Sequence, residues 1–198
     1  MPETRCAAVV LAAGASARLG QAKQMIEVGG ESLLRRTARL ALEAGCAPVV
    51  VVLGFEAGRM RPELAGFPVE VVENPEWREG MGASLRSGVS LLGTGEFRPT
   101  DILLLVCDQP RLTAEHLQVL LAQHAAGGMA ITASAYAGRV GVPAVFAAEL
   151  VPELAECAGD RGAREVIRKD PARVKAVSWP DGEVDVDRPE DLKGLPGM

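Results

Sequence analysis

Short apolar runs alternate with longer stretches of helical periodicity along this chain. Runs of β-branched and other apolar residues of this length are typical of buried strands. On that pattern, strands are predicted at residues 7–11, 49–53, 69–73, 101–106, 129–136, 143–146 and 174–178. The predicted strands therefore recur through most of the sequence.

Apolar residues at helical spacing predict the elements between those strands. Helices are expected at residues 32–44, 57–64, 81–92, 148–154 and 161–169, with two more beginning near residues 113 and 189. Ser32 and Thr113 suit N-caps, because their hydroxyls can accept hydrogen bonds from the free N–H groups of a first turn. Gly45 and Gly93 stand where two of the helices are expected to end.

The order of these elements predicts the fold class. Strands and helices alternate over the first two thirds of the chain, which favours a mostly parallel sheet with helices on both faces. We therefore expect an α/β, Rossmann-like three-layer sandwich with a mostly parallel mixed sheet. Neither an internal repeat nor a linker divides the sequence, so a single domain over residues 1–198 is expected.

Composition excludes some classes of function. Apolar residues make up 48% of the chain and charged residues 24%, which is ordinary for a globular protein. The net charge of −5 argues against general binding to nucleic acid or to an anionic membrane. Each apolar run is well short of the ~18 residues that a membrane span needs. The first residues lack the pattern of a signal peptide, so a cytoplasmic location is expected.

Cysteines, histidines and tryptophans give no sign of a metal or nucleophile site. The four cysteines are scattered without a Cys-x-x-Cys pair, so they are expected to be buried free thiols. His116 and His124 lie in one predicted helix without a third ligand at helical spacing. Both histidines are interpreted as surface or packing residues, and Trp77 and Trp179 as packing residues.

A glycine-bearing loop with two cations follows the first predicted strand. It reads Gly-Ala-Ser-Ala-Arg-Leu-Gly-Gln-Ala-Lys from Gly14 to Lys23. Gly14 and Gly20 let the main chain approach an anion, while Arg18 and Lys23 supply positive charge. The spacing matches neither the Walker loop nor the Gly-x-Gly-x-x-Gly fingerprint. A phosphate-binding loop is one interpretation, and an ordinary strand-to-loop turn is the other.

Carboxylates stand near two other expected strand ends. Asp108 follows the strand at 101–106, while Asp185 and Asp187 precede the last helix. Carboxylates at the edge of a parallel sheet suit Mg²⁺, which takes hard oxygen ligands and shares them with phosphates. The residues alone also allow a turn-forming Asp108 and an acidic helix start after Asp187. Asp187 is the preferred second ligand, and Asp185 is the fallback.

Two glycine-rich segments are further candidates for ligand contacts. Residues 80–88 read Gly-Met-Gly-Ala-Ser-Leu-Arg-Ser-Gly, and residues 159–164 read Gly-Asp-Arg-Gly-Ala-Arg. In the first segment, small residues leave room for a nucleotide base and Ser84 offers a hydroxyl. In the second, Arg161 and Arg164 are suited to hold an anion. Composition alone favours a plain loop before a helix in the first segment and allows a solvated helix start in the second.

Several segments in order along the chain resemble the nucleotidyltransferases that activate a phosphorylated acceptor with a nucleoside triphosphate. The loop up to Lys23 is similar to their signature loop, and Asp108-Gln109-Pro110 to their metal-binding strand end. Residues 80–88 resemble their Gly-Met-Ser-Ser-Ser-Leu segment. Residues 185–192 resemble their closing Asp-x-Asp-Thr-Pro-Glu-Asp-Leu motif, with Arg188 in place of Thr.

Two further segments point to one branch of these enzymes. Residues 159–164 and 141–146 are similar to the Gly-Asp-x-Gly-Ala-Arg and Gly-His/Asn-Pro-x-x-Phe motifs of molybdenum cofactor cytidylyltransferases, with Val142 in place of a polar residue. The chain thus resembles the molybdenum cofactor cytidylyltransferase branch of the MobA-like NTP transferases. That resemblance implies a nucleotide-diphospho-sugar transferase-like fold.

The resemblance also implies the site residues. Its catalytic set is Arg18, Lys23 and Asp108. Its nucleotide-binding residues are Leu11, Ala12, Ala13, Gly14, Ser16, Arg18, Lys23, Gly82, Ser84 and Asp108. Its acceptor-binding residues are Gly141, Pro143, Asp160, Arg161 and Arg164. Its metal ligands, for Mg²⁺, are Asp108 and Asp187.

The implied reaction is transfer of CMP from CTP to a molybdopterin-type molybdenum cofactor with release of pyrophosphate. The Ala12-Ala13-Gly14 form of the loop favours this cytidylyl branch over the guanylyl branch, where Ala-Gly-Gly is usual. A molybdenum hydroxylase or its chaperone is the candidate protein partner. Two alternatives stay open: a transferase for a sugar phosphate or another phosphorylated alcohol, and a non-catalytic protein that delivers cofactor to a molybdenum hydroxylase.

Overall fold

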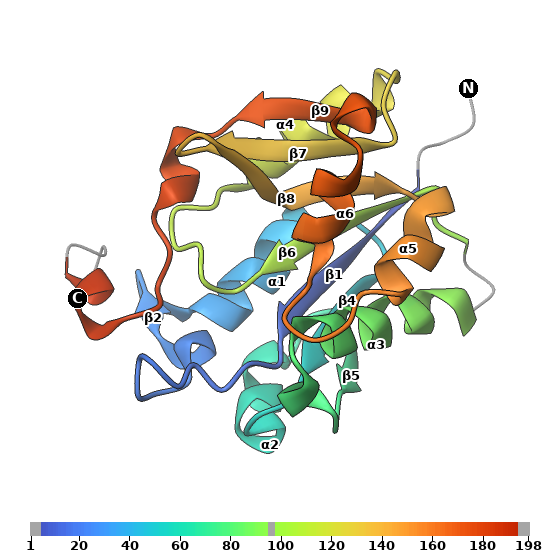
Figure 1. The fold of residues 1–198 in the computed structure, drawn as a ribbon. Helices are drawn as coiled ribbons and strands as arrows, with labels where there is room; N and C mark the ends of the chain where they lie inside the picture. Colours follow the sequence, from blue (N-terminus) through green and yellow to red (C-terminus); the bar gives the residue numbers. More distant parts are fainter. Residues whose placement is uncertain (1–4, 95–97, 194–198) are drawn as a thin grey trace.

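A central sheet runs through the molecule with helices packed on both faces (Figure 1). The computed structural model describes residues 5–94 and 98–193. The single domain expected over residues 1–198 extends beyond these ranges and stays a prediction. The strands are β1 Cys6–Ala12, β2 Glu27–Val28, β3 Glu31–Ser32, β4 Val49–Leu53, β5 Glu70–Glu73, β6 Asp101–Val106, β7 Ile131–Tyr136, β8 Arg139–Ala147 and β9 Val174–Ser178. The α-helices are α1 Leu33–Glu43, α2 Ala57–Met60, α3 Met81–Thr94, α4 Ala114–Ala125, α5 Val151–Ala155 and α6 Ala163–Lys169.

The main sheet is mixed but mostly parallel, as predicted. Its seven strands in the described ranges have the order β5-β4-β1-β6-β8-β7-β9. β1 pairs in parallel with β4 and β6, β4 with β5, and β7 with β9. Only β8 runs antiparallel to its neighbours among these strands. The carboxyl ends of β1 and β6 therefore meet at one edge of the sheet.

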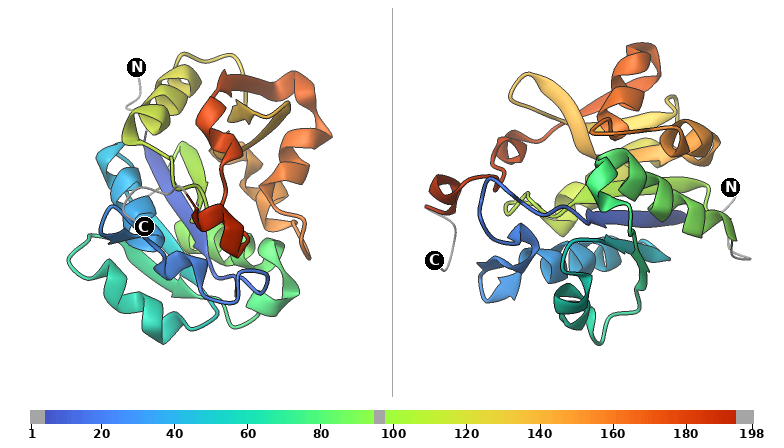
Figure 2. Two further views of the ribbon diagram at one scale, coloured as in Figure 1. Left: turned by 90° about the vertical axis from the view of Figure 1, so that its left-hand side faces the viewer. Right: turned by 60° about the horizontal axis from the view of Figure 1, so that its bottom comes forward.

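Alternating residues of β1 supply the two halves of the core. Ala8 and Val10 pack toward α1 and α4, whereas Val9 and Leu11 pack toward α3, α5 and α6. Every residue of β1 is buried because both faces of the sheet are covered (Figure 2). This burial explains why the first predicted strand reads as a continuous apolar run instead of alternating with polar residues.

The helix signals in the sequence are mostly confirmed. The Ser32 and Thr113 hydroxyls accept hydrogen bonds from the N–H groups of Arg35 and His116, both at 3.2 Å. Gly45 follows α1 with φ +88°, a conformation that favours glycine. Gly93 does not end its helix, because α3 continues through it to Thr94.

Other boundaries shift by a few residues. The helix expected at 161–169 begins at Ala163, and the expected last helix is the single 3-10 turn Pro189–Leu192. The strand expected at 143–146 extends over Arg139–Ala147 because it forms a hairpin with β7. Arg139 and Gly141 interrupt the apolar pattern at the start of β8 and hid this extension.

The residues expected to serve packing do so. All four cysteines are buried and free. His124 is buried, with its ring nitrogens 3.0 Å from Thr132 Oγ1 and Asp101 Oδ1. His116 stacks on Trp179 at 4.7 Å, and Trp77 packs edge-on against Phe55 at 5.4 Å. Within the described residues, no helix combines the length and apolar character needed to cross a bilayer.

Two glycines of α3 give a matched test of this packing. A Cβ built on Gly88 would lie 2.5 Å from Val9 Cγ1 in the core, whereas one on Gly93 would meet nothing within 4 Å. Gly88→Ala is therefore expected to lower the free energy of unfolding by roughly 1–3 kcal/mol. Gly93→Ala is expected to raise it by about 0.5–1 kcal/mol, because alanine has the higher helix propensity. Urea denaturation of both variants measures this, and equal effects would mean that α3 packs differently on β1.

Candidate active site

The loop after β1 is held by a buried side chain that the sequence analysis did not single out. Gln24 Nε2 donates hydrogen bonds to the carbonyl oxygens of Ala12 and Gly14, at 2.8 and 2.7 Å. The Ser16 hydroxyl accepts a hydrogen bond from the Lys23 N–H at 3.2 Å. The loop therefore folds back on the end of β1 and brings Lys23 to the edge of the sheet.

Lys23 joins the opening loop to both predicted metal ligands. Its Nζ lies 2.7 Å from Asp108 Oδ2 and 2.9 Å from Asp187 Oδ1. Burial lowers the pKa of Lys23, but the two carboxylates outweigh it and raise the pKa above its usual value. The hydrogen bond from Lys23 lowers the pKa of Asp187 against the smaller opposing effect of burial. Lys23 and Asp187 are thus held in their charged forms.

The C-terminal segment reaches this point because a buried valine anchors it. Val186 is fully buried against the loop and α1, in a cluster with Leu19, Ile26, Val28 and Leu33. Its N–H donates a hydrogen bond to the Asp108 carbonyl at 2.9 Å. Asp187 on one side of Val186 faces Lys23, and Asp185 on the other side lines a cavity beside Asp108.

Arg18 lies at the rim of the loop. Its side chain is 79% exposed, and its Nη1 is 3.9 Å from Asp187 Oδ2. The Arg188 side chain is also exposed and lies 3.7 Å from Glu190. The Asp191 carboxylate accepts hydrogen bonds from the N–H groups of Asp187 and Arg188, at 3.0 and 2.7 Å. These bonds fix the backbone at Asp187, so a side-chain hydroxyl at position 188 is not needed to hold it.

The donor set fits a divalent cation that shares its ligands with phosphates. Two carboxylate oxygens lie within 3 Å of one ammonium group, so a cation already bridges them. No group of three or more His, Cys, Asp or Glu side chains in the described ranges is arranged to hold a metal. Mg²⁺ is commonly held by one or two carboxylates plus substrate phosphates and water. Asp108 and Asp187 match that requirement.

Asp185 lies outside the contact that joins Lys23 to Asp108 and Asp187. Burial raises the pKa of Asp185, and the nearby charges of Asp108 and Asp187 raise it further. Asp187 shares the Lys23 ammonium with Asp108 and so remains the preferred second metal ligand, with Asp185 as the fallback.

A cavity of about 590 Å³ lies between the opening loop and the start of α3. Predicted nucleotide-binding residues that line it are Leu11, Ala12, Ala13, Gly14, Ser16, Lys23, Ser84 and Asp108. Trp77 and Arg78 also line it, and the Arg78 guanidinium stacks on the Trp77 ring at 4.3 Å. The size of the cavity is suitable for a nucleotide.

Gly82 has a packing role that the sequence did not reveal. Its N–H donates to the Gly159 carbonyl at 2.9 Å, and a built Cβ would lie 2.6 Å from the Cys157 carbonyl oxygen. Gly82 does not line the nucleotide cavity. Ser84 does, and its hydroxyl accepts a hydrogen bond from Asn74 Nδ2 at 3.1 Å. The glycine therefore lets α3 approach residues 157–159, which brings Asp160 beside Met81 at the cavity wall.

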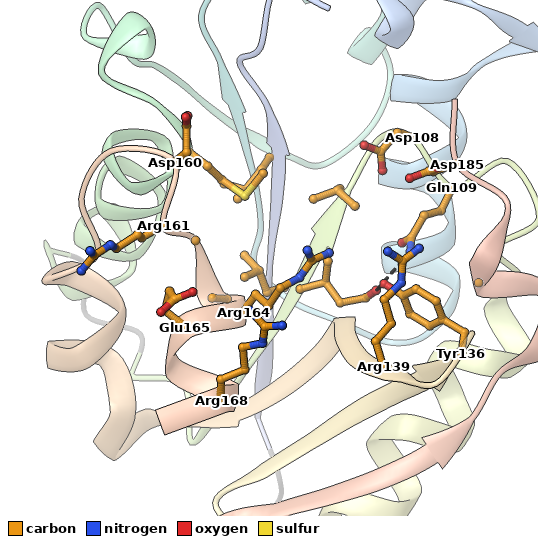
Figure 3. Close-up of a pocket in the computed structure, with 18 residues that line it drawn as sticks. Asp108, Gln109, Tyr136, Arg139, Asp160, Arg161, Arg164, Glu165, Arg168 and Asp185 are labelled. Atoms are coloured by element: carbon orange, nitrogen blue, oxygen red, sulfur yellow. Dashed lines mark hydrogen bonds between the residues drawn. The ribbon is translucent and has the colours of Figure 1, made fainter. Parts of the chain in front are cut away.

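A second cavity, of about 380 Å³, lies on the other side of Asp108 (Figure 3). Asp160, Arg161 and Arg164 line it, as the sequence predicts for the acceptor side. The two cavities share Leu11, Met81, Val106, Asp108 and Asp160 in their walls. Asp108 thus stands between two adjacent spaces, which is the arrangement that a reaction joining two substrates requires.

Gly141 and Pro143 do not line either of these cavities, while Val142 between them lines the second. The Val142 carbonyl accepts hydrogen bonds from Gln109 Nε2 at 3.0 Å and from the Tyr136 hydroxyl at 3.1 Å. A Cβ on Gly141 would lie 3.0 Å from that hydroxyl. The main chain of this segment therefore positions cavity side chains, so the apolar Val142 side chain does not disrupt it.

The sequence analysis missed several residues of the second cavity. Arg139, Arg168, Tyr136 and Gln109 all line it. Arg168 follows Arg164 by four residues in α6, so helical spacing would have placed both on one face. Arg139 and Tyr136 lie in the β7–β8 hairpin, and their place at the cavity had no sequence signal.

Comparisons with known proteins agree with this architecture. Residues 8–175 match the model of the MobA-like NTP transferase domain. The nicotine blue oxidoreductase of Paenarthrobacter nicotinovorans is 35% identical over 199 residues, which cover 94% of each chain. The crystal structure of Rv0371c from Mycobacterium tuberculosis H37Rv is 31% identical, has a TM-score of 0.81 and covers 97% of both chains. A structure of Rv0371c in complex with manganese is 30% identical, with a TM-score of 0.75, and covers 97% of this chain and 98% of that one.

Proposed function

Because this chain belongs to the MobA-like NTP transferase family and is a nucleotidyltransferase, we propose that it transfers CMP from CTP to a molybdopterin-type molybdenum cofactor. The observation that carries the proposal is the pair of adjacent cavities that share Asp108. The loop of the first cavity presents Lys23, and the second is lined by arginines suited to an anionic acceptor. Pyrophosphate is the second product.

The chain needs no nucleophile of its own for this reaction. A phosphate oxygen of the acceptor attacks the α-phosphorus of CTP, and the bond from that phosphorus to the bridging oxygen of the β-phosphate breaks. The leaving pyrophosphate takes the bridging oxygen and the electron pair of the broken bond. The attacking phosphate monoester is already anionic near neutral pH, so no general base is required.

The residues around Asp108 have distinct roles in this proposal. Arg18 and Lys23 hold the β- and γ-phosphates and stabilise the charge that develops on pyrophosphate. Asp108 and Asp187 would hold Mg²⁺, which would supply charge neutralisation at the phosphoryl group under attack. Lys23 contacts both carboxylates, so its ammonium must move toward the phosphates before the two carboxylates can hold a metal.

The preference for CTP rests on the opening loop. Ala12-Ala13-Gly14 lines the nucleotide cavity, and this form resembles the cytidylyl branch. Ser84 is the hydroxyl of the 80–88 segment that lines the same cavity. Gly82 is no longer assigned to the nucleotide, because it packs against residues 157–159. The product would pass to a molybdenum hydroxylase or to its chaperone.

The same active site would also serve a sugar phosphate or another phosphorylated alcohol as acceptor. Pyrophosphate release tests the alternatives directly, with Mg²⁺, freshly prepared molybdenum cofactor and each of CTP, GTP, ATP and UTP. Release that depends on both CTP and the cofactor is expected. Release with GTP would keep the fold and chemistry but overturn the cytidylyl assignment. Release with a sugar phosphate and not with the cofactor would overturn the acceptor.

The name of the Paenarthrobacter relative suggests a control for redox activity. That protein is called an oxidoreductase, whereas the opening loop here lacks the Gly-x-Gly-x-x-Gly fingerprint of dinucleotide binding. We expect no oxidation of NADH or NADPH by the purified chain under the assay conditions. Turnover of either would place a redox reaction beside the transferase activity.

A further inference from the structure

Three arginines that line the second cavity form no ion pair with a carboxylate of the described residues. Arg139 comes from β8, while Arg164 and Arg168 come from α6. Figure 3 shows the Arg139 and Arg164 side chains extending toward one another, with Arg168 beside Arg164. In the described ranges, none of the three has an Asp or Glu oxygen within 4.0 Å, unlike Arg39 or Arg173. Positive charges gathered in a cavity attract an anion from solution.

In the described ranges, the carboxylates of the cavity form no ion pair with this arginine group. Asp108 and Asp160 stand where the cavity borders the nucleotide cavity, and Glu165 lies on the side of Arg161, whose guanidinium is directed away from the other three (Figure 3). Asp185 lies near enough to Arg139 for the arginine charge to act on it. The Tyr136 ring supports Arg139, whose guanidinium carbon is 5.3 Å from the ring centroid. The arginine group is therefore not neutralised by direct contact with a carboxylate of the cavity.

The reacting phosphate of an acceptor must lie beside Asp108, where the cavity borders the space assigned to the triphosphate. A volume of about 380 Å³ is far more than one phosphate group fills, so the rest of the acceptor extends toward the arginines. Guanidinium groups bind oxyanions through paired N–H donors, which matches a second charged group better than a neutral one.

We propose that Arg139, Arg164 and Arg168 form a subsite for a second anionic group of the acceptor, separate from the phosphate that attacks CTP. This inference rests on the proposed nucleotidyl transfer and deepens it. The substrate class is a phosphate monoester that carries a further oxyanion or an anionic metal-oxo group. A sugar monophosphate has only one anionic group and would leave the arginine subsite without a ligand.

Oxyanion binding in the presence of nucleotide tests the subsite. Molybdate is titrated calorimetrically into protein saturated with Mg²⁺ and a non-reacting α,β-methylene analogue of CTP, which fills the first cavity. We expect saturable binding of one molybdate. Arg164→Gln and Arg168→Gln should each weaken it by about tenfold or more, as loss of a charge-assisted hydrogen bond does. Affinity for the CTP analogue should be unchanged.

Matched variants keep the outcome clear. Arg59→Gln removes an exposed arginine that pairs with Glu56 at 3.1 Å on α2, and it should bind molybdate as the wild type does. Arg168→Lys keeps the positive charge but lacks the paired N–H donors of the guanidinium, so its affinity for molybdate should be intermediate. Melting curves establish that each variant is folded.

Several results would overturn the subsite. One is the absence of saturable molybdate binding by the wild-type chain, and another is wild-type affinity for molybdate in both glutamine variants. Competition between molybdate and the CTP analogue would overturn it as well. Failure of the proposed function gives a different pattern. If molybdate binding depends on the arginines but CMP is not transferred to the cofactor, the subsite stands and the cofactor is not the acceptor. If CMP is transferred but molybdate binding does not depend on the arginines, the proposed function stands and the subsite is wrong.

Discussion

Asp108→Asn is expected to lower the rate of pyrophosphate release by roughly 10²–10⁴-fold, while the affinity for CTP measured without metal changes little. Asp108 lines both cavities and also contacts Lys23, whereas Asp160 lines both cavities without an ion pair to Lys23 among the described residues. Asparagine has nearly the same size but no charge, so the pair with Asp187 loses half of its negative charge. Stabilisation of phosphoryl charge by a metal amounts to several kcal/mol, and each 1.36 kcal/mol changes a rate by about tenfold.

Asp170→Asn is the matched control for that measurement. Asp170 is exposed, and its side chain caps the 3-10 turn Pro171–Arg173 by accepting a hydrogen bond from the Ala172 N–H at 3.0 Å. Asparagine caps as well as aspartate does, so the variant carries the same change in net charge without loss of the cap. Retention of most of the activity by Asp108→Asn would mean that the reaction does not depend on this carboxylate.

Lys23→Met is expected to have two effects of opposite sign. Turnover should fall by about 10²-fold or more, because a cation that stabilises the leaving phosphates is lost. Binding of Mn²⁺ to the nucleotide-free protein should become tighter by about tenfold, because Asp108 and Asp187 no longer have an ammonium between them at 2.7 and 2.9 Å. Electron paramagnetic resonance of free Mn²⁺ in a titration measures the second effect without any turnover.

Lys175→Met provides the comparison for this variant. Lys175 lies in β9 and donates to the Gln123 carbonyl at 3.2 Å, so its loss removes one exposed charge elsewhere on the molecule. It should leave both turnover and Mn²⁺ affinity near their original values. Weaker Mn²⁺ binding in Lys23→Met than in the wild type would contradict the idea that Lys23 occupies the position of the metal. The double variant with Asp108→Asn should lose the gain in Mn²⁺ affinity.

Local chemistry made much of the fold predictable. The continuous apolar run of β1 and the β-branched run of β4 required burial on both faces, which only an interior strand of a layered sheet provides. Ser32, Thr113 and Gly45 act on neighbouring backbone groups, so their roles at helix ends follow from a few residues of sequence. Gly93 was wrongly predicted to end α3, because the helix continues through it to Thr94.

Individual site residues were harder to predict than the elements that carry them. Asp108 was identifiable because it follows a strand whose end must face the edge of the sheet. Gly82 was assigned to the nucleotide from its small size, but the size serves a close approach to residues 157–159. No sequence motif includes Gln24, Arg139 or Arg168. Gln24 nevertheless holds the opening loop, and both arginines line the second cavity.

The sequence by itself determined the strands of the main sheet, the helix ends at Ser32, Thr113 and Gly45, the loop that carries Lys23 and the strand end that carries Asp108, because each depends on neighbouring residues. Only the tertiary structure decided that Asp187 meets Lys23, and that Arg139 from a hairpin joins Arg164 and Arg168 from a helix. Burial of Val186 against the opening loop fixes the first of these, and the pairing of β8 with β6 and β7 fixes the second. Such contacts depend on how distant surfaces fit together, which local residue patterns do not specify.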